Sequence, residues 1–411
     1  MRVFIIEPTL ILRVGHVSQC TYLFAQGAEE LNNEVTIVSP KNSPTGLKID
    51  EFFQVSRSLP NTYETFLIEG LKFEYKFKRL LHLLTFPIGE KRRNRANFFI
   101  DRFFWFTIYF RKTTIELEQL FKLHEINSQD RIVFPNADLL TVKATLNILN
   151  KMGKHLSPSL GLRFINVMEN NGIPRIISHD SLFRQIGKMK NRGWKIEISA
   201  ETESYRTHIA RFTPESFVCE YPHEMHLRKK TPISKSGKIT VGSLGSARPD
   251  KGFTRLALFI PKILAAFGPK IRVTIQEGVM SWGYEYEKTL SELRSYKAVS
   301  ILPGYLPSLE MKRAIENCDI LFMPYDEGTY EYRGSAMLFE AADRNIPMIV
   351  PSRTGLGEVV RKYGIGATFS SEADLISAFN SILQTEPSVF RARFAEYNNQ
   401  RVRSFRRLIE G

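Results

Sequence analysis

The chain has 411 residues, and with 43% hydrophobic and 12% aromatic residues it has the composition of a globular protein, which excludes a disordered one. Its 57 Lys and Arg against 43 Asp and Glu give a formal net charge of +14. The sequence has neither a signal peptide pattern nor an uncharged stretch near the roughly 18 apolar residues of a membrane span. Its three separated cysteines favour a reducing compartment. We therefore expect a cytoplasmic protein, soluble or peripheral on the inner face of the cell membrane.

The first half of the sequence predicts strands that alternate with helices. After the first strand comes a loop that contains Gly15, and an amphipathic helix is expected near residues 18–32. The region of about 65–125 is predicted to be a helical insertion. The strands are expected at 2–8, 34–40, 131–136, 161–167, 194–200 and 217–222.

Almost all of the excess charge lies in two segments. Residues 72–112 carry a net charge of +8 together with 12 aromatic residues, and residues 391–407 carry +5. One interpretation of the first segment is docking on anionic lipid, and the other is a solvated basic face over ordinary core aromatics. Nucleic acid is an unlikely partner, because it would leave the motifs described below without a purpose. The side chains expected at a membrane or acceptor face are Lys91, Arg92, Arg93, Arg95 and Trp105.

The second half has a more regular pattern. Short apolar runs alternate with amphipathic segments of helical periodicity, which is typical of βαβ units on a parallel sheet. A polar segment at 226–238 suits a linker. The predicted fold class is therefore α/β, with two Rossmann-like domains facing across a cleft. The domains are expected at 1–227 and 228–385, followed by a C-terminal helix at 386–411.

The loop GSLGSARPDKGF at 242–253 follows the first strand of the second domain. Its small residues let the backbone approach a ligand, and Arg248 and Lys251 supply two cations just before a helix. This combination suits a diphosphate. The alternative is a solvated turn that caps the next helix.

The segment 325–350 contains a second candidate motif. Gly334 and Ser335 are expected at the start of a helix that carries Glu340 within an apolar run. A carboxylate there is costly without a partner. The partner would be either the two hydroxyls of a vicinal diol or a nearby arginine, namely Arg333 or Arg344.

These motifs resemble the donor-binding half of GT-B glycosyltransferases, in particular glycosyltransferase family 4. The resemblance implies that Lys251 contacts the donor phosphates and that Glu340 holds the ribose hydroxyls of a nucleotide sugar. It also implies that Gly334 and Ser335 meet the phosphate or the sugar. The family's first acidic position falls on Tyr332, one residue after Glu331, and its arginine position falls on Ser246, with Arg248 two residues later.

The resemblance further implies that the first domain binds the acceptor and that the backbone at Gly15 approaches the donor. The C-terminal helix would cross back to the first domain. The reaction would proceed with retention of configuration, and no catalytic side chain is assigned. No DxD motif and no ligand-spaced cluster is present in the sequence, so neither a metal nor another cofactor is expected.

The sequence therefore predicts a glycosyltransferase. Its donor would be a nucleotide diphosphate sugar, and its acceptor a glycan or a lipid-linked or cell-surface saccharide precursor. Two alternatives stay open, which are a nucleotide-sugar epimerase of the GT-B type and a non-enzymatic protein that binds anionic membranes or nucleic acid.

Overall fold

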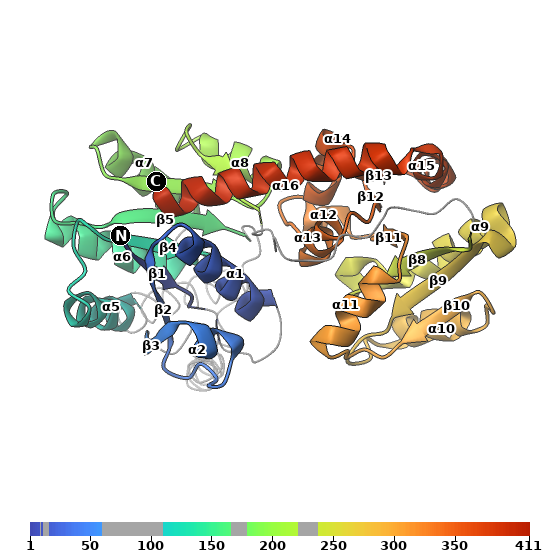
Figure 1. Cartoon of the computed structure of the whole chain (residues 1–411), viewed down its shortest axis with the longest axis horizontal. Coiled ribbons are helices and arrows are strands. Elements are labelled where there is room, and N and C mark those ends of the chain that lie inside the picture. The colour runs from blue at the N-terminus through green and yellow to red at the C-terminus, as the bar shows by residue number, and fades with distance from the viewer. Residues whose placement is uncertain (9, 11–15, 60–109, 166–178, 221–236) are drawn as a thin grey trace, which may run out of the picture. The chain divides into compact units, whose positions relative to one another are not determined.

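A computed structural model describes residues 1–8, 10, 16–59, 110–165, 179–220 and 237–411 of the chain (Figure 1). The chain divides into two compact units. The first unit comprises Met1–Glu201, Arg206–Pro222 and Ser404–Gly411, and the second comprises Thr202–Tyr205 and His223–Arg403.

The first unit is built on a seven-stranded sheet with the order β3-β2-β1-β4-β5-β6-β7, in which all neighbouring strands are parallel. Its strands are β1 (Arg2–Ile6), β2 (Glu34–Pro40), β3 (Gln54–Leu59), β4 (Arg131–Phe134), β5 (Ser159–Phe164), β6 (Ile196–Ala200) and β7 (Phe217–Val218). Its helices are α1 (His16–Glu30), α2 (Lys48–Phe52), α5 (Arg111–Leu123), α6 (Leu139–Met152), α7 (His179–Asn191) and α8 (Glu203–Ala210), the last of which begins in residues assigned to the second unit.

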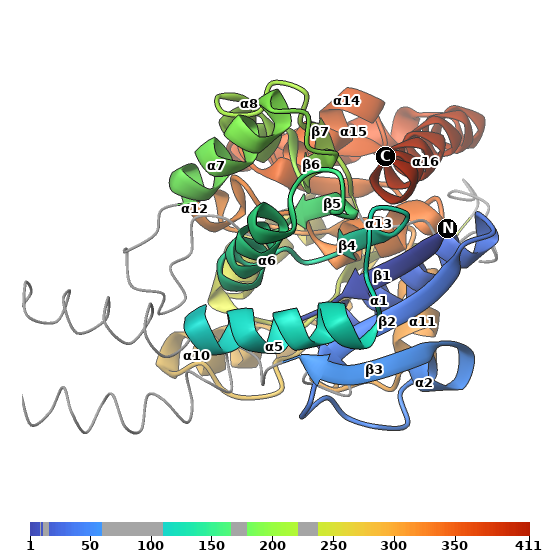
Figure 2. The ribbon, with the colours of Figure 1, turned by 90° about the vertical axis from the view of Figure 1, so that its left-hand side faces the viewer.

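Both faces of this sheet are buried, and for this reason its central strands are continuous apolar runs. In β1, Val3 and Ile5 belong to a core cluster that also contains Phe24 of α1. Phe4 points to the other face, where its ring lies 5.5 Å from the ring of His124, the residue that follows α5. Helices α5 and α6 pack side by side (Figure 2).

The end of the chain completes the first core. The last helix, α16 (Pro387–Glu410), belongs to the first unit from Ser404 onward. Leu408 is fully buried, and its carbonyl accepts hydrogen bonds from Nε and Nη2 of the buried Arg131 at 3.0 and 2.8 Å. Burial lowers the pKa of Arg131 to about 10. The ring of Phe405 stacks edge-on against Phe24, so α16 is a structural part of this unit.

The second unit has a six-stranded parallel sheet with the order β10-β9-β8-β11-β12-β13. Its strands are β8 (Ile239–Ser243), β9 (Ile271–Gln276), β10 (Val299–Leu302), β11 (Ile320–Phe322), β12 (Met348–Pro351) and β13 (Gly366–Phe369). Its α-helices are α9 (Leu256–Phe267), α10 (Tyr284–Arg294), α11 (Ser308–Glu316), α12 (Glu327–Tyr330), α13 (Ala336–Asp343), α14 (Gly355–Tyr363), α15 (Glu372–Gln384) and the first part of α16. Short 3-10 helices lie at Pro249–Lys251, Phe253–Arg255 and Gly268–Lys270.

The prediction of an α/β protein with two Rossmann-like units is confirmed, since both sheets are parallel and have the order of that fold. The predicted alternation of strands and helices in the second half is present, and the helix expected directly after Lys251 begins at Leu256. Gly252 causes this delay, because its left-handed conformation (φ 72°) ends the first 3-10 turn. Strand β3 was not predicted, because it is a partly exposed edge strand whose polar residues hide the strand pattern.

Most of the predicted basic insertion lies outside the described residues. Only its end is described, where α5 covers Arg111–Leu123. Most of the predicted linker at 226–238 also lies outside them. Among the helices in the described ranges, none is both long and apolar enough to cross a membrane.

Candidate functional site

The candidate site lies in the second unit, where the order of its strands reverses. Strand β8 is followed in sequence by β9 on one side of it, whereas β11 lies on its other side. Ligands of open parallel sheets bind beyond the carboxyl ends of the strands at such a reversal. The loops after β8 and β11 contain residues 244–248 and 323–326, which include the predicted Arg248.

The loop after β8 turns sharply at Gly245. This residue has a φ of 94°, a conformation that favours glycine, and its N–H donates to Oε1 of Gln276 at 2.8 Å. Gln276, at the end of β9, uses its Nε2 to donate to the carbonyl of Gly304 at 3.0 Å. This one buried side chain at the end of β9 therefore links the loops that follow β8 and β10.

Lys251 and Gly252 are joined to the loop after β11. Gly252 lies so close to this loop that a Cβ atom would collide with the carbonyl oxygen of Pro324. The carbonyl of Asp250 accepts a hydrogen bond from the backbone N–H of Asp326 at 2.9 Å. These contacts explain the glycine of the Lys-Gly pair, because only glycine allows the two loops to approach this closely.

Arg248 is held by a neighbouring carboxylate. Its Nε and Nη2 donate to the two oxygens of Asp250 at 3.0 and 2.8 Å, and Tyr330 Oη donates to the same carboxylate at 3.4 Å. The charge of Arg248 is therefore already balanced within the protein. Lys251 supplies the remaining positive charge of this group of three charged side chains.

Lys251 points toward the turn at Gly245. Its Nζ lies 3.1 Å from the position that a Cβ atom would take on Gly245, and 5.9 Å from the centre of the Tyr325 ring. Burial, and to a lesser extent the positive charge of Arg248, lowers the pKa of Lys251 to about 8. A bound anion would favour the charged form of this lysine, so the site suits a negatively charged ligand.

The N-terminal residues of α13 also lie beside Gly245 and Tyr325. Ser335 is the N-cap of this helix and accepts a hydrogen bond from the N–H of Met337 at 3.3 Å. Met337 Cε lies 3.6 Å from the Cβ position of Gly245, and Ser335 Oγ lies 3.4 Å from Tyr325 Oη. The structure thus brings Gly245, Lys251 and Ser335 together at a helix N-terminus, where the partial positive charge favours anions.

The far end of α13 is fixed by the last helix of the chain. Arg401 Nη1 forms a buried ion pair with Asp343 Oδ1 at 2.5 Å, and Asn398 Nδ2 donates to the carbonyl of Ala342 at 3.4 Å. This anchoring positions the N-terminus of α13 through the rigid helix.

Glu340 has an arginine partner. Its Oε2 accepts a hydrogen bond from Nη1 of Arg344 at 2.7 Å, one turn further along, and Arg344 is completely buried. Of the two interpretations left open for this carboxylate, pairing with Arg344 is therefore observed. The Glu340 side chain is still 30% exposed, so the ion pair leaves part of it accessible to a ligand.

The residues before α13 are arranged differently. Glu331 is exposed, whereas the carbonyl of Tyr332 accepts a hydrogen bond from Thr202 Oγ1 at 3.1 Å. The ring of Tyr332 contacts that of Tyr205, with the centres 6.3 Å apart. Gly334 directly precedes the N-cap residue of α13. Tyr332 is thus fixed in place, and Glu331 is the side chain with access to solvent.

The predicted residues of the first half cannot be placed. Gly15 and the five residues expected at the membrane or acceptor face, Lys91, Arg92, Arg93, Arg95 and Trp105, lie outside the described residues. At the equivalent strand reversal of the first unit, after β1 and β4, Asn136 Nδ2 donates to the fully buried Glu7 at 2.6 Å. Within the described ranges, no group of three or more His, Cys, Asp or Glu side chains could hold a metal ion.

Several residues of the site were not singled out from the sequence. Gln276 and Asp250 join loops that follow different elements. Tyr325 lies beside Lys251, and its ring centre is 4.5 Å from that of Tyr330. The only signal for Gln276 was a polar residue at the end of an apolar strand. Burial raises the pKa of Tyr325 to about 12, which keeps its hydroxyl protonated.

Comparison with known proteins gives a family match for the second unit. Residues 223–401, somewhat less than half of the chain, match a family described as glycosyl transferases group 1. The matched residues cover most of the second unit. The chain is thus a transferase enzyme, as the sequence predicts. No curated protein sequence gives a match.

Solved structures show the same two-unit GT-B fold. A lipopolysaccharide outer core galactosyltransferase, WaaB, is 13% identical, with a TM-score of 0.61 over 100% of this chain and 99% of its own. A trehalose-6-phosphate protein from E. coli, bound with UDP-2-fluoro glucose, is 11% identical, with a TM-score of 0.57 over 100% and 97%. A trehalose-6-phosphate synthase studied for glycosyltransfer with retention is 13% identical, with a TM-score of 0.57 over 100% and 97%. At these identities the likeness concerns the fold.

Proposed function

We propose that the chain transfers a sugar from a nucleoside diphosphate sugar, bound by the second unit, to a saccharide acceptor bound by the first. The observation that carries this proposal is the meeting of Lys251, the Gly245 turn and the N-cap of α13 beyond the carboxyl ends of β8 and β11. A cation, close backbone approach and a helix N-terminus together suit a diphosphate.

In this proposal Lys251 neutralises the diphosphate as it leaves, and Ser335 and Gly334 contact it at the start of α13. Arg248 is already paired with Asp250. It would contact the diphosphate only by interacting with Asp250 and the phosphates at the same time. The transfer would need no metal ion, because these groups supply the positive potential. Treatment of the purified enzyme with EDTA is expected to leave turnover unchanged, and loss of activity that Mg²⁺ or Mn²⁺ restores would contradict this part of the proposal.

We further propose membership of glycosyltransferase family 4 and transfer with retention. The Lys251–Gly252 pair and the later helix that carries Glu340 support the family, and the likeness to a synthase studied for transfer with retention supports the stereochemistry. Glu340 would hold the ribose hydroxyls with the part of its carboxylate that is still exposed, while Arg344 orients it. Nuclear magnetic resonance of the product's anomeric proton tests retention directly, and an inverted product would refute it.

The acceptor is proposed to be a glycan or a lipid-linked saccharide precursor at the cytoplasmic face of the membrane. The lipopolysaccharide galactosyltransferase among the similar structures supports this acceptor class, and the basic aromatic segment supports the location. Charge reversal at Lys91, Arg92 and Arg93 together is expected to weaken binding to anionic vesicles at physiological salt. Unchanged vesicle binding would remove this segment from the membrane face.

The donor is identified by a thermal-shift panel of UDP-, GDP-, ADP- and TDP-sugars, because a ligand that binds only the folded state raises its melting temperature. No shift with any donor would count against the proposed activity. The variant for Glu340 is Glu340→Gln, which keeps a hydrogen bond to Arg344 but removes the charge; the buried guanidinium of Arg344 keeps its second carboxylate, Glu316, whose Oε1 lies 3.6 Å from Nε. Glu340→Gln is expected to lose donor binding and keep its melting temperature, while the exposed Glu285→Gln serves as control.

A further inference from the structure

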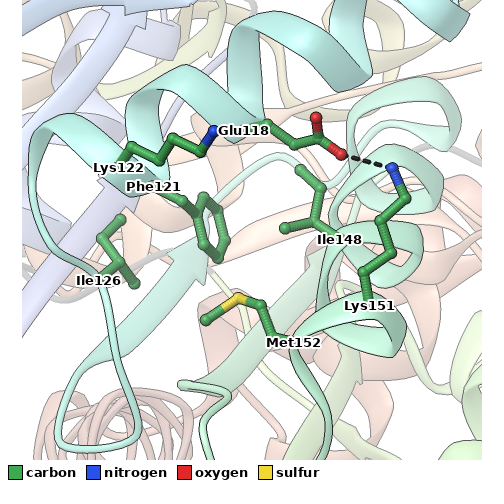
Figure 3. Close-up of a pocket in the computed structure, with 7 residues that line it drawn as sticks. All are labelled: Glu118, Phe121, Lys122, Ile126, Ile148, Lys151 and Met152. Atoms are coloured by element: carbon green, nitrogen blue, oxygen red, sulfur yellow. Dashed lines mark hydrogen bonds and ion pairs between the residues drawn. The ribbon is translucent and has the colours of Figure 1, made fainter.

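A pocket of about 290 Å³ lies in the first unit between α5 and α6 (Figure 3). Its walls are apolar. Phe121 comes from α5, Ile126 from the following loop, and Ile148 and Met152 from α6. Phe121, Ile126 and Ile148 are each 5% exposed or less, so they belong to the core and form the floor of the pocket.

The rim of this pocket is charged. Lys122 and Lys151 are both exposed, and Glu118 lies between the two helices, where its Oε1 pairs with Lys151 Nζ at 2.6 Å. The Lys151 side chain is 60% exposed and the Glu118 side chain 33% exposed, so water screens this pair and it breaks easily. Two lysines and one glutamate leave a net positive charge around an apolar opening.

The pocket is remote from the loops in which ligands of parallel sheets bind. Helix α5 connects β3 to β4, and α6 connects β4 to β5, so both helices run back toward the edge where the strands begin. The lining residues come from the C-terminal halves of these helices. Two exposed leucines follow at the same ends, Leu123 (70% exposed) and Leu156 (64%).

We propose that this pocket binds the acyl chain of an anionic lipid, with Lys122 and Lys151 at the head group. The volume corresponds to an alkyl segment of about eight to ten carbons, if a methylene fills about the volume of a water molecule. The apolar wall accommodates the chain, and the positive rim matches an anionic head. The exposed leucines extend the apolar surface beyond the opening, as expected where a protein meets the acyl region of a lipid layer.

The probe is decanoate below its micellar concentration, measured by isothermal titration calorimetry on the full chain. Decyl maltoside, whose alkyl chain is one carbon longer and whose head is neutral, is the comparison ligand. Met152→Trp, which fills the pocket, is expected to weaken decanoate binding about tenfold or more, while Leu309→Trp on an exposed position of the second unit leaves it unchanged. Equal melting temperatures of these variants show that the fold is kept.

The charged rim is tested separately. The double variant Lys122→Gln with Lys151→Gln is expected to weaken decanoate binding about fivefold and to leave decyl maltoside unchanged. The charge-matched control is Lys270→Gln with Lys288→Gln, which changes two exposed lysines of the second unit. Glu118→Gln should strengthen decanoate binding, because it releases Lys151.

Three results would overturn the proposal. The first is the absence of decanoate binding to the wild-type chain. The second is equal loss of decanoate and decyl maltoside binding in the double lysine variant, which would make the pocket a general apolar site. The third is that the wild-type chain binds no decanoate but forms a concentration-dependent dimer, and that Met152→Trp dissociates this dimer. The pocket would then be the contact site of a second copy of the chain. Donor binding in the thermal-shift panel is independent of all three.

Discussion

Replacement of Lys251 by methionine should make the unliganded protein more stable while it removes donor binding. Methionine has a similar length and an apolar end, so it keeps the packing beside Tyr325 but removes the buried charge. The pKa of Lys251 is lowered from 10.5 to about 8, chiefly by burial. At about 1.4 kcal/mol for each pH unit, holding the charged form in the folded protein costs about 3 kcal/mol at neutral pH.

The lowered pKa of Lys251 also determines how the stability difference between wild type and variant changes with pH. Because the folded-state pKa is lowered, the unfolded chain binds more protons between pH 8 and 10.5, and the wild type gains stability as the pH rises through this window. Lys251→Met lacks this gain. Its advantage of about 3 kcal/mol at pH 7 should therefore shrink toward zero above pH 10.5.

The assay is urea-dependent hydrogen exchange of the peptides that contain β8 and β11, measured at pH 7 and, after correction for intrinsic exchange, at higher pH. Lys288→Met, on an exposed position of α10, is the control and is expected to change stability by less than about 0.5 kcal/mol. The wild type should be stabilised by the donor that the panel identifies, and the variant should not. A less stable variant at pH 7, or a stability difference that does not vary with pH, would refute the reasoning.

Three further changes test how the structure is held together. Gly252→Ala forces a side chain against a neighbouring backbone in a left-handed conformation, so a lower melting temperature and no donor-induced shift are expected; a normal donor shift would contradict the geometry. Gln276→Leu leaves an N–H and a carbonyl of two loops without their partner, and should cost about 1–3 kcal/mol for each buried group in urea unfolding. Leu408→Ala should destabilise the first unit by about 2–5 kcal/mol, visible as faster hydrogen exchange in β1 and β4; exchange unchanged there would show that the end of α16 is dispensable.

The regular elements of the second unit could be predicted almost completely. Its strands are apolar runs and its helices amphipathic, because both faces of a parallel sheet are buried under helices. The edge strand β3 was missed for the same reason, since it is only partly buried and needs no apolar pattern. The start of α9 was misplaced because one glycine conformation decided it.

In the candidate site, the sequence by itself determined which loops carry the chemistry, since Lys251 and Ser335 follow strands whose carboxyl ends meet in any parallel sheet of this order. Only the tertiary structure decided how the charges are shared. Arg248 is held by Asp250, and Glu340 by Arg344. Each of these side chains had more than one possible partner in the sequence. The choice depends on distances of a few ångströms and on burial, because the energy of an ion pair changes steeply with both, and neither quantity exists before the chain has folded.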